Sequence, residues 1–182
     1  DHSVSVQLDG ENDFMATGFE KNLAGKDLTI EMWIQPSQLQ NGTLFSHGNI
    51  NNSLELSLTP DSRLKAKVGT SEILSVPVAF LLLIMVTAGS QGSWAHVALT
   101  YEAEGFVSAY YNYKEVISNS KTEVYSGIGN FVVGKSISNN GNYFNGKVHN
   151  LRIWEKIISA GNLQINSLIQ LAGIEPGLLG YY

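Results

Sequence analysis

Cysteine is absent from this 182-residue sequence. Its absence excludes disulfide bonds, thiolate metal sites and cysteine nucleophiles. It does not fix the cellular compartment, because a domain of this length can be held together by buried apolar side chains, whereas small secreted domains are the ones that depend on disulfides. With 43% apolar and 15% charged residues, the composition is that of a globular protein, and we expect one domain over residues 1–182.

Positive charge is also scarce in this chain. Eleven lysines and arginines stand against 16 acidic residues, so the formal net charge is −5, and the basic residues form no cluster. The sequence therefore lacks the electrostatic footprint of a protein that binds nucleic acid or an anionic lipid surface. We expect neither kind of partner.

Apolar runs long enough to cross a membrane are missing as well. The run VPVAFLLLIMV has eleven residues (76–86), whereas a spanning helix needs about 20. The amino terminus, DHSVSVQLDG, has neither an initiator methionine nor the basic stretch of a secretory leader. We therefore predict no membrane insertion, and we expect the chain to be a mature or excised piece of a longer protein.

The apolar run at 76–86 has two interpretations. A strand that is covered on both sides appears as a continuous apolar run, so the segment can be a buried strand followed by a loop. The alternative is an exposed loop that forms a contact surface. The solvent exposure of residues 81–84 distinguishes the two.

Alternation of apolar and polar residues is the dominant pattern in the chain. Over residues 28–35 the even positions are apolar and the odd positions mostly polar, which predicts a half-buried strand. Further strands of this kind are expected at 53–59, 63–68, 94–102, 106–113 and 130–135. Short strands joined by turns such as TPDS, AEG and NNGN indicate an antiparallel all-β protein with two packed sheets.

One segment near the carboxyl terminus has helical spacing. Ser159 can cap a helix that contains Leu163 and Leu168 and that ends before Gly173. We expect this helix to lie on the surface of the sandwich. The final residues, EPGLLGYY, turn at Pro176 and could pair as a last strand.

Four stretches, in order and at familiar separations, carry a resemblance to a known family. They are LDGENDF (8–14), LTIEMWIQP (28–36), SWAHVALTYEAEGFVSAYYN (93–112) and YFNGKVHNLRIWEKIIS (143–159). The set resembles the laminin G-like modules of the concanavalin A-like lectin/glucanase superfamily, which includes pentraxins. The resemblance implies a jelly-roll sandwich with ligand sites on rim loops or on a concave face. The terminal IEPGLLGYY is similar to the segment that leads into a neighbouring module.

This fold hosts sugar binders, adhesion modules and glycoside hydrolases, so function must come from the residues. Hydrolysis of a glycosidic bond normally needs two carboxyl groups about 5–9.5 Å apart. The superfamily's glucanases carry closely spaced acids on one strand, and no such pattern is present. Glu31 and Glu55 are each the single acid of their strands, and we expect these acids to be solvated. We therefore predict no catalytic residues.

Two loops have the composition of a sugar-binding surface, which combines aromatic rings with amides and hydroxyls. Residues 47–53 supply His47, Asn51 and Asn52, and residues 136–143 supply Asn140 and Tyr143. These five residues are candidate ligand contacts. The alternative is that the asparagines serve only the turns, where they tolerate left-handed backbone.

Tyr113 is a sixth candidate contact. The family usually has Asp-Gly at this hairpin, because a two-residue loop favours positive φ, whereas here the residues are Asn112 and Tyr113. A tyrosine at this position either strains the turn or changes its type, and it leaves a ring at the tip of the hairpin.

Calcium is the cofactor that the resemblance raises, since it takes six to eight oxygen ligands and several relatives bind it at the rim. Pentraxin-like relatives carry Asp or Asn near the position of Asn51 and Asn52, with further acids on a loop corresponding to residues 135–142. Those acids are absent here, which argues against a pentraxin-type double site. A single calcium ion near Asp9 or Asp13 stays open, and we assign no metal ligands.

The sequence thus favours a non-catalytic extracellular module, secreted or on the cell surface, that binds glycans or takes part in adhesion. Its partner would be a glycan or a cell-surface or matrix protein. The first alternative is a structural or protein-docking module without sugar affinity, in which the run at 76–86 forms the interface. The second is a glycoside hydrolase on the same fold.

Overall fold

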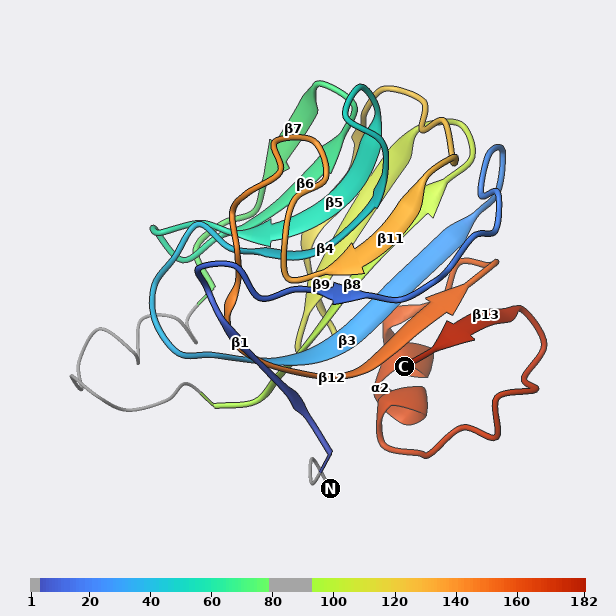
Figure 1. The fold of residues 1–182 in the computed structure, drawn as a ribbon. Helices are drawn as coiled ribbons and strands as arrows, with labels where there is room; N and C mark the ends of the chain where they lie inside the picture. Colours follow the sequence, from blue (N-terminus) through green and yellow to red (C-terminus); the bar gives the residue numbers. More distant parts are fainter. Residues whose placement is uncertain (1–3, 79–92) are drawn as a thin grey trace.

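Two antiparallel sheets pack face to face in the computed structural model, which describes residues 4–78 and 93–182 (Figure 1). The seven-stranded sheet has the order β1 (Val6–Asp9), β12 (Asn145–Trp154), β3 (Leu28–Pro36), β8 (Ala95–Glu102), β9 (Phe106–Tyr111) and β10 (Lys114–Lys121), and β13 (Leu178–Tyr181) also pairs with β12. The six-stranded sheet has the order β2 (Met15–Ala16), β11 (Asn130–Val133), β4 (Thr43–Gly48), β5 (Ser53–Leu58), β6 (Leu64–Val68) and β7 (Ser71–Leu74). The predicted all-β architecture is confirmed, with a strand at each of the six predicted places.

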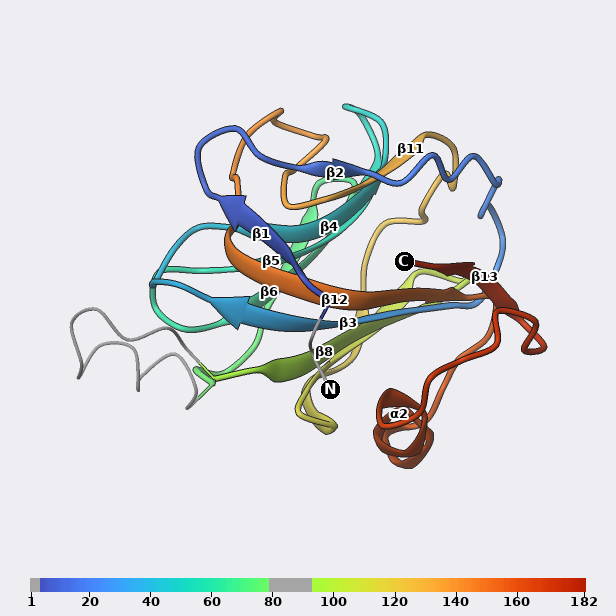
Figure 2. The same ribbon diagram turned by 60° about the horizontal axis from the view of Figure 1, so that its bottom comes forward.

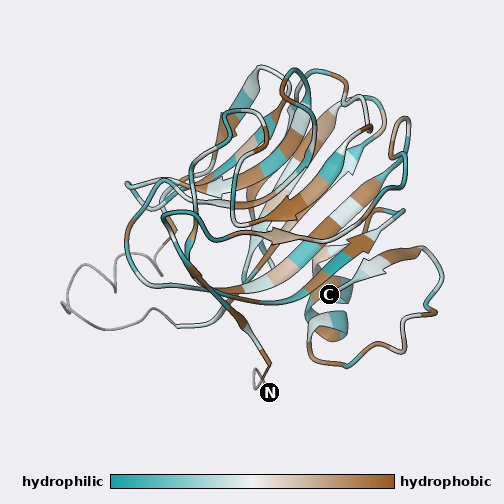
Figure 3. Cartoon of the chain, viewed as in Figure 1, coloured by the Kyte–Doolittle hydropathy of each residue, from teal (hydrophilic) through white to brown (hydrophobic). Residues whose placement is uncertain are grey.

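The main hydrophobic core lies between the sheets and takes side chains from both. Strand β3 is an example: its even-numbered residues from Leu28 to Ile34 are apolar and are buried in this core, as the alternation predicted (Figure 3). The prediction of a half-buried strand is wrong, however. Thr29 and Glu31 on the other face are also buried, since a second layer covers that face.

The second layer contains helix α2 (Ala160–Ser167), which lies on the side of the seven-stranded sheet that faces away from the other sheet (Figure 2). The Ser159 hydroxyl accepts a hydrogen bond from the Asn162 amide at 3.4 Å, so the predicted cap is confirmed. Leu163 anchors the helix in a small second core with Trp154. The helix ends at Ser167, before the predicted stop. The Arg152 guanidinium donates to the carbonyl of Asn166 in its last turn and to the carbonyl of Ile169 just beyond it.

The β9–β10 hairpin turns on Asn112 and Tyr113, whose φ angles are 45° and 67°. Positive φ at both central residues defines the type I′ turn that Asp-Gly normally forms, so the turn type is kept and the tyrosine adopts left-handed backbone. The Tyr113 ring stacks on His96, with centroids 4.9 Å apart, and its hydroxyl lies 2.6 Å from the Ser167 hydroxyl. These contacts tie the hairpin to helix α2 and offset the backbone strain.

The apolar run at 76–86 is described only at its start. Val76 is 65% exposed, whereas Val78 is buried and its amide donates to the Ser62 carbonyl at 2.7 Å. Residues 81–84, which would distinguish a buried strand from a contact surface, lie outside the described residues. In the part of the chain that the structure describes, no helix has the length and apolar character to cross a membrane.

Candidate functional site

Strand β12 contains an irregularity at the edge of the seven-stranded sheet. His149 pairs with Trp33 and Arg152 pairs with Glu31, so β12 has one residue more than β3 between these pairs. Asn150 occupies this β-bulge with a φ of 50°, a left-handed conformation that asparagine tolerates better than most residues. Bulges of this kind redirect side chains, and they often border functional sites.

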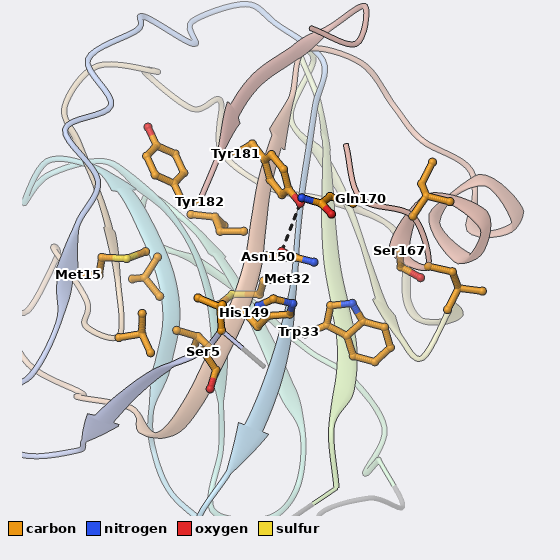
Figure 4. Close-up of a pocket in the computed structure, with 17 residues that line it drawn as sticks. Ser5, Met15, Met32, Trp33, His149, Asn150, Ser167, Gln170, Tyr181 and Tyr182 are labelled. Carbon is orange, nitrogen blue, oxygen red and sulfur yellow. Dashed lines mark hydrogen bonds between the residues drawn. The ribbon is translucent and has the colours of Figure 1, made fainter. Parts of the chain in front are cut away.

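A groove of about 580 Å³ opens at this bulge. It lies between β1, which pairs with the part of β12 before the bulge, and β13, which pairs with the part after it. Strand β1 pairs with residues 145–148 and β13 with residues 152–154. We call the opening the edge groove. Figure 4 shows Trp33, Tyr181 and Gln170 on the helix side of β12, with Tyr182 and Met15 on the opposite side.

The polar groups of the edge groove are neutral. The Tyr181 hydroxyl donates to Asn150 Oδ1 at 3.4 Å. Partial burial lowers the pKa of His149, and the positive charge of Arg152 acts in the same direction, so the imidazole is uncharged at neutral pH. Among the described residues that line the groove, none is acidic and none is a lysine or arginine. The described lining therefore offers hydrogen bonds and apolar rings without a net charge.

A buried carboxylate lies beneath the helix side of the groove. Glu31 accepts a hydrogen bond from Trp154 Nε1 at 2.9 Å, contacts His96 Nε2 at 2.8 Å, and has the Arg152 guanidinium 3.9 Å away. The expectation that Glu31 is solvated is therefore wrong, because helix α2 and its neighbours enclose the carboxylate. His96 is likewise buried on β8. Glu31 holds the second layer to the sheet.

The outer face of the six-stranded sheet has a corresponding carboxylate. Glu55 Oε1 accepts hydrogen bonds from the hydroxyls of Ser46, Ser53 and Ser136 at 2.8–3.0 Å and from the Ser138 amide at 3.2 Å. Glu55 is 3% exposed, so its expected solvation is also wrong. The two buried acids lie on opposite outer faces of the sandwich, so they cannot act as a catalytic pair.

The structure places His47 in the main core and not on the surface. The ring is fully buried and packs against Phe19, Phe131 and Tyr125. Burial lowers the pKa of His47 to about 4, and a contact with the Gly129 backbone offsets this only in part. His47 is thus a neutral core residue.

The two asparagines that follow His47 belong to an ordered turn. Asn49 Oδ1 accepts hydrogen bonds from the Asn51 and Asn52 amides at 2.9 and 3.1 Å. The Asn52 side chain bonds to Val124 and Ser126 on a neighbouring loop, whereas Asn51 is exposed. Asn52 therefore serves the turn, and Asn51 is the one that faces solvent.

The remaining candidates do not gather at one site. Tyr113 lies against helix α2, and Tyr143 is half-buried on the loop before β12. Asn140 is exposed and lines a second hollow, of about 430 Å³, at the outer edge of the six-stranded sheet. None of the six predicted contacts lines the edge groove, and their roles as ligand contacts stay predictions.

One carboxylate oxygen near the calcium position that the sequence leaves open is already engaged. Asp9 Oδ1 accepts the backbone amides of Glu11, Asn12 and Asp13 at 2.8–3.2 Å, and these bonds lower the pKa of Asp9. Within the described ranges, no group of three or more acidic or histidine side chains is arranged to hold a metal. The residues present do not fit a pentraxin-type site, and a single calcium ion near Asp9 or Asp13 stays open.

The residues of the edge groove were not identified from the sequence, although some signals were there. Alternation already put Trp33 on the outer face of β3, and the terminal pair Tyr181 and Tyr182 stood out as apolar. No sequence signal marked the bulge at Asn150 or showed that β1 and β13 would leave a gap beside it.

Comparison with known proteins places this geometry in a family. A profile of the concanavalin A-like lectin/glucanases superfamily matches residues 9–164. The chain belongs to this superfamily. The resemblance seen in the sequence is confirmed, whereas a search of curated proteins finds no match.

Solved structures confirm the jelly-roll fold of this superfamily member. A heptameric pentraxin from Limulus polyphemus has a TM-score of 0.66 at 16% identity, covering 94% of this chain and 84% of its own. A putative carbohydrate-binding protein from Bacteroides ovatus has a TM-score of 0.66 at 18% identity, covering 97% of this chain, which spans about half (52%) of that protein. The carbohydrate-binding module CBM40 of a Ruminococcus gnavus sialidase, bound to α2,3 sialyllactose, has a TM-score of 0.60 at 16% identity, covering 88% and 97%.

Proposed function

We propose that this chain is a non-catalytic carbohydrate-binding module of an extracellular protein, secreted or on the cell surface, and that the edge groove receives the glycan. The lining of the groove carries the proposal. The rings of Trp33 and Tyr181 line the groove with the amides of Asn150 and Gln170, and the Tyr182 ring lines it from the opposite side of β12. Apolar ring faces match the less polar faces of a pyranose, and amides satisfy its hydroxyl groups.

The neutral lining suggests the chemistry of the ligand. A sugar hydroxyl both donates and accepts, as do an amide and an uncharged imidazole such as His149. A neutral glycan can therefore replace its hydrogen bonds to water with hydrogen bonds to the groove. A charged glycan would lack a counter-ion among the described lining residues. The described lining residues also include no pair of carboxyl groups such as hydrolysis normally requires, which supports binding without catalysis.

The structural comparisons support the same proposal at the level of fold. Two of the similar structures are a carbohydrate-binding module and a putative carbohydrate-binding protein. Others are a leech intramolecular trans-sialidase and the NanB sialidase of Streptococcus pneumoniae, so the scaffold alone does not separate binding from catalysis. The neutral lining of the edge groove supports binding, because its described residues include no pair of carboxyl groups.

The test is a glycan array probed with the purified chain and with two variants. Asn150→Gly removes the amide and keeps the left-handed backbone, and Tyr182→Ala removes an exposed ring. We expect each variant to weaken binding by about tenfold or more, because each loses a direct contact worth about 1–3 kcal/mol. Asn119→Gly is the matched control, since Asn119 also has positive φ (34°) but lies on β10, away from the groove.

The outcomes separate the proposal from its rivals. Binding that both groove variants reduce and the control leaves unchanged supports the edge groove. Binding lost in Asn51→Ala or Tyr143→Ala, and kept in the groove variants, would move the site to the rim loops that the sequence predicted. Turnover of a bound glycan would contradict the non-catalytic function.

A protein-docking module is the second candidate, and one surface favours it. The segment around helix α2 exposes several large apolar side chains, namely Ile157, Ile165, Leu168, Ile169 and Ile174, which are 42–87% exposed. Apolar surface of this kind often marks an interface. A blank array from a folded sample would favour this function over glycan binding.

A further inference from the structure

The second hollow lies beside β2 and β11, at the edge of the six-stranded sheet. We call it the β2–β11 hollow. Met15 and Val133 line the edge groove, whereas their strand neighbours Ala16 and Val132 line the β2–β11 hollow. The two openings share no lining residue among those described, so they are separate sites.

The chemistry of the β2–β11 hollow differs from that of the edge groove because it contains a cation. Lys135 Nζ lies 3.8 Å from the centre of the Phe14 ring and 3.2 Å from Asn140 Oδ1, and all three residues line the hollow. The ring and the amide hold the ammonium in place. Among the described residues, Lys135 forms no ion pair with a carboxylate.

This arrangement prepares the ammonium for an outside anion. An ammonium has three N–H donors, and one is used by Asn140. The aromatic face removes water from one side of the charge, which strengthens its attraction to an anion. Phe14 is 42% exposed, so part of its ring is also available to a sugar.

The loop that supplies Lys135 and Asn140 is fixed by the buried Glu55. The Ser136 hydroxyl bonds both carboxylate oxygens, at 3.0 and 2.9 Å, and the Ser138 amide bonds one of them. These contacts join the loop to the sheet through protein atoms alone. The hollow is therefore built in advance of binding, which lowers the entropic cost of holding a ligand.

We propose that the β2–β11 hollow is a second ligand site, which takes a sugar unit carrying one anionic group, with Lys135 as the counter-ion and Phe14 as the stacking ring. Glu20 also borders the hollow. Its carboxylate opposes dense negative charge, so the site suits a single carboxylate or sulfate on an otherwise neutral sugar. This proposal does not depend on the edge groove.

The test uses sugars that differ at one position: galactose, galacturonic acid and galactose 6-sulfate, with N-acetylneuraminic acid as a further carboxylate. Titrations of the isotope-labelled chain are followed by NMR. We expect at least one anionic sugar to shift the signals of Phe14, Lys135 and Asn140, with an affinity about tenfold above that of galactose. The 6-sulfate and the uronic acid together decide between sulfate and carboxylate.

Matched variants separate this site from general charge attraction and from the edge groove. Lys135→Gln should abolish the preference for the anionic sugar, whereas Lys147→Gln, which removes the same charge from β12, should keep it. Asn150→Gly should leave the titration unchanged, so failure of the edge groove does not affect the result. The proposal is overturned if no anionic sugar shifts the three signals, or if Lys135→Gln and Lys147→Gln behave alike.

Discussion

The two outer faces of the sandwich are covered in different ways, and each depends on one buried glutamate. On the seven-stranded sheet, Glu31 meets an indole, an imidazole and a guanidinium beneath helix α2. On the six-stranded sheet, Glu55 meets only hydroxyls and a backbone amide beneath the loop at 135–142. A buried carboxylate must form hydrogen bonds to offset the loss of its hydration. Glu31 has a charged neighbour, Arg152, whereas the described partners of Glu55 are neutral.

The difference shows that the layer over each sheet is held by a different kind of contact, and that the two contacts contribute differently to stability. The Glu31 cluster includes a buried cation, so loss of either charge leaves the other uncompensated. The Glu55 cluster contains no cation within hydrogen-bonding distance of the carboxylate among its described partners, so its loss removes hydrogen bonds without exposing a buried charge. Each candidate ligand site adjoins one of these anchors, the edge groove on the Glu31 side and the β2–β11 hollow on the Glu55 side.

The largest predicted effect compares the anchors directly. Glu31→Gln should lower the free energy of unfolding by about 3–5 kcal/mol, because Arg152 is left buried without its counter-charge. Glu55→Gln should lower it by about 1–3 kcal/mol, because only hydrogen bonds to a charged acceptor are lost. Urea denaturation measures both, and Glu72→Gln, at an exposed position, is the control expected to stay within about 0.5 kcal/mol. Equal losses at Glu31 and Glu55 would contradict the comparison.

The next prediction concerns His47, which is buried in the core between the two sheets and, unlike Glu31 and Glu55, has no regular hydrogen-bond partner for its side chain among the described residues. Neither nitrogen of His47 makes a regular hydrogen bond, and the pKa of about 4 lies below the unfolded value of 6.5. The unfolded chain therefore takes up a proton first as the pH falls. The stability from this group is complete above about pH 6.5 and falls by about 3 kcal/mol as the pH drops to about 4.

The variant His47→Phe isolates this effect, because a phenyl ring suits the aromatic neighbours and does not titrate. We expect the free energy of unfolding of the wild type to fall relative to that of His47→Phe by about 3 kcal/mol between pH 7 and pH 4, whichever protein is the more stable at pH 7. Other groups titrate equally in both proteins and cancel in the difference. Parallel pH profiles would show that His47 is not held neutral.

The smallest predicted effect concerns the link between the β9–β10 hairpin and helix α2. Tyr113→Phe removes the hydroxyl that lies 2.6 Å from the Ser167 hydroxyl and keeps the ring stacked on His96. We expect a loss of about 1 kcal/mol in the free energy of unfolding. A double-mutant cycle with Ser167→Ala tests the contact, and additive losses would rule out direct coupling between the two residues.

Much of the architecture could be predicted from the sequence because it depends on local patterns. Alternation located β3, and a hydroxyl at Ser159 followed by an apolar helical face located α2. Burial of individual polar residues was not predictable in this way. Glu31 and Glu55 have the sequence context of exposed strand residues, and only the helix and the loop that cover them show that they are buried.

The candidate site was less predictable than the fold, because it depends on how strand ends meet. Asn51 and Asn140 were selected as loop asparagines, a residue type that also serves turns, and Asn52 does so through Val124 and Ser126. Tyr113 was selected as an unusual turn residue, and the structure gives its ring a packing partner. Asn150 had no distinguishing signal, because the bulge appears only when β12 is paired with β3.

The sequence by itself determined the fold class, the strand periodicity, the helix start and the absence of disulfide chemistry, since each follows from residue type and spacing along the chain. The tertiary structure decided which acids are buried, where the edge groove opens, and that Lys135 stands between a ring and an amide. Those features depend on residues far apart in the sequence, such as Phe14 with Lys135 and Glu31 with Arg152. Their energies arise from desolvation and contact, which exist only once the two sheets and their covering layers have come together.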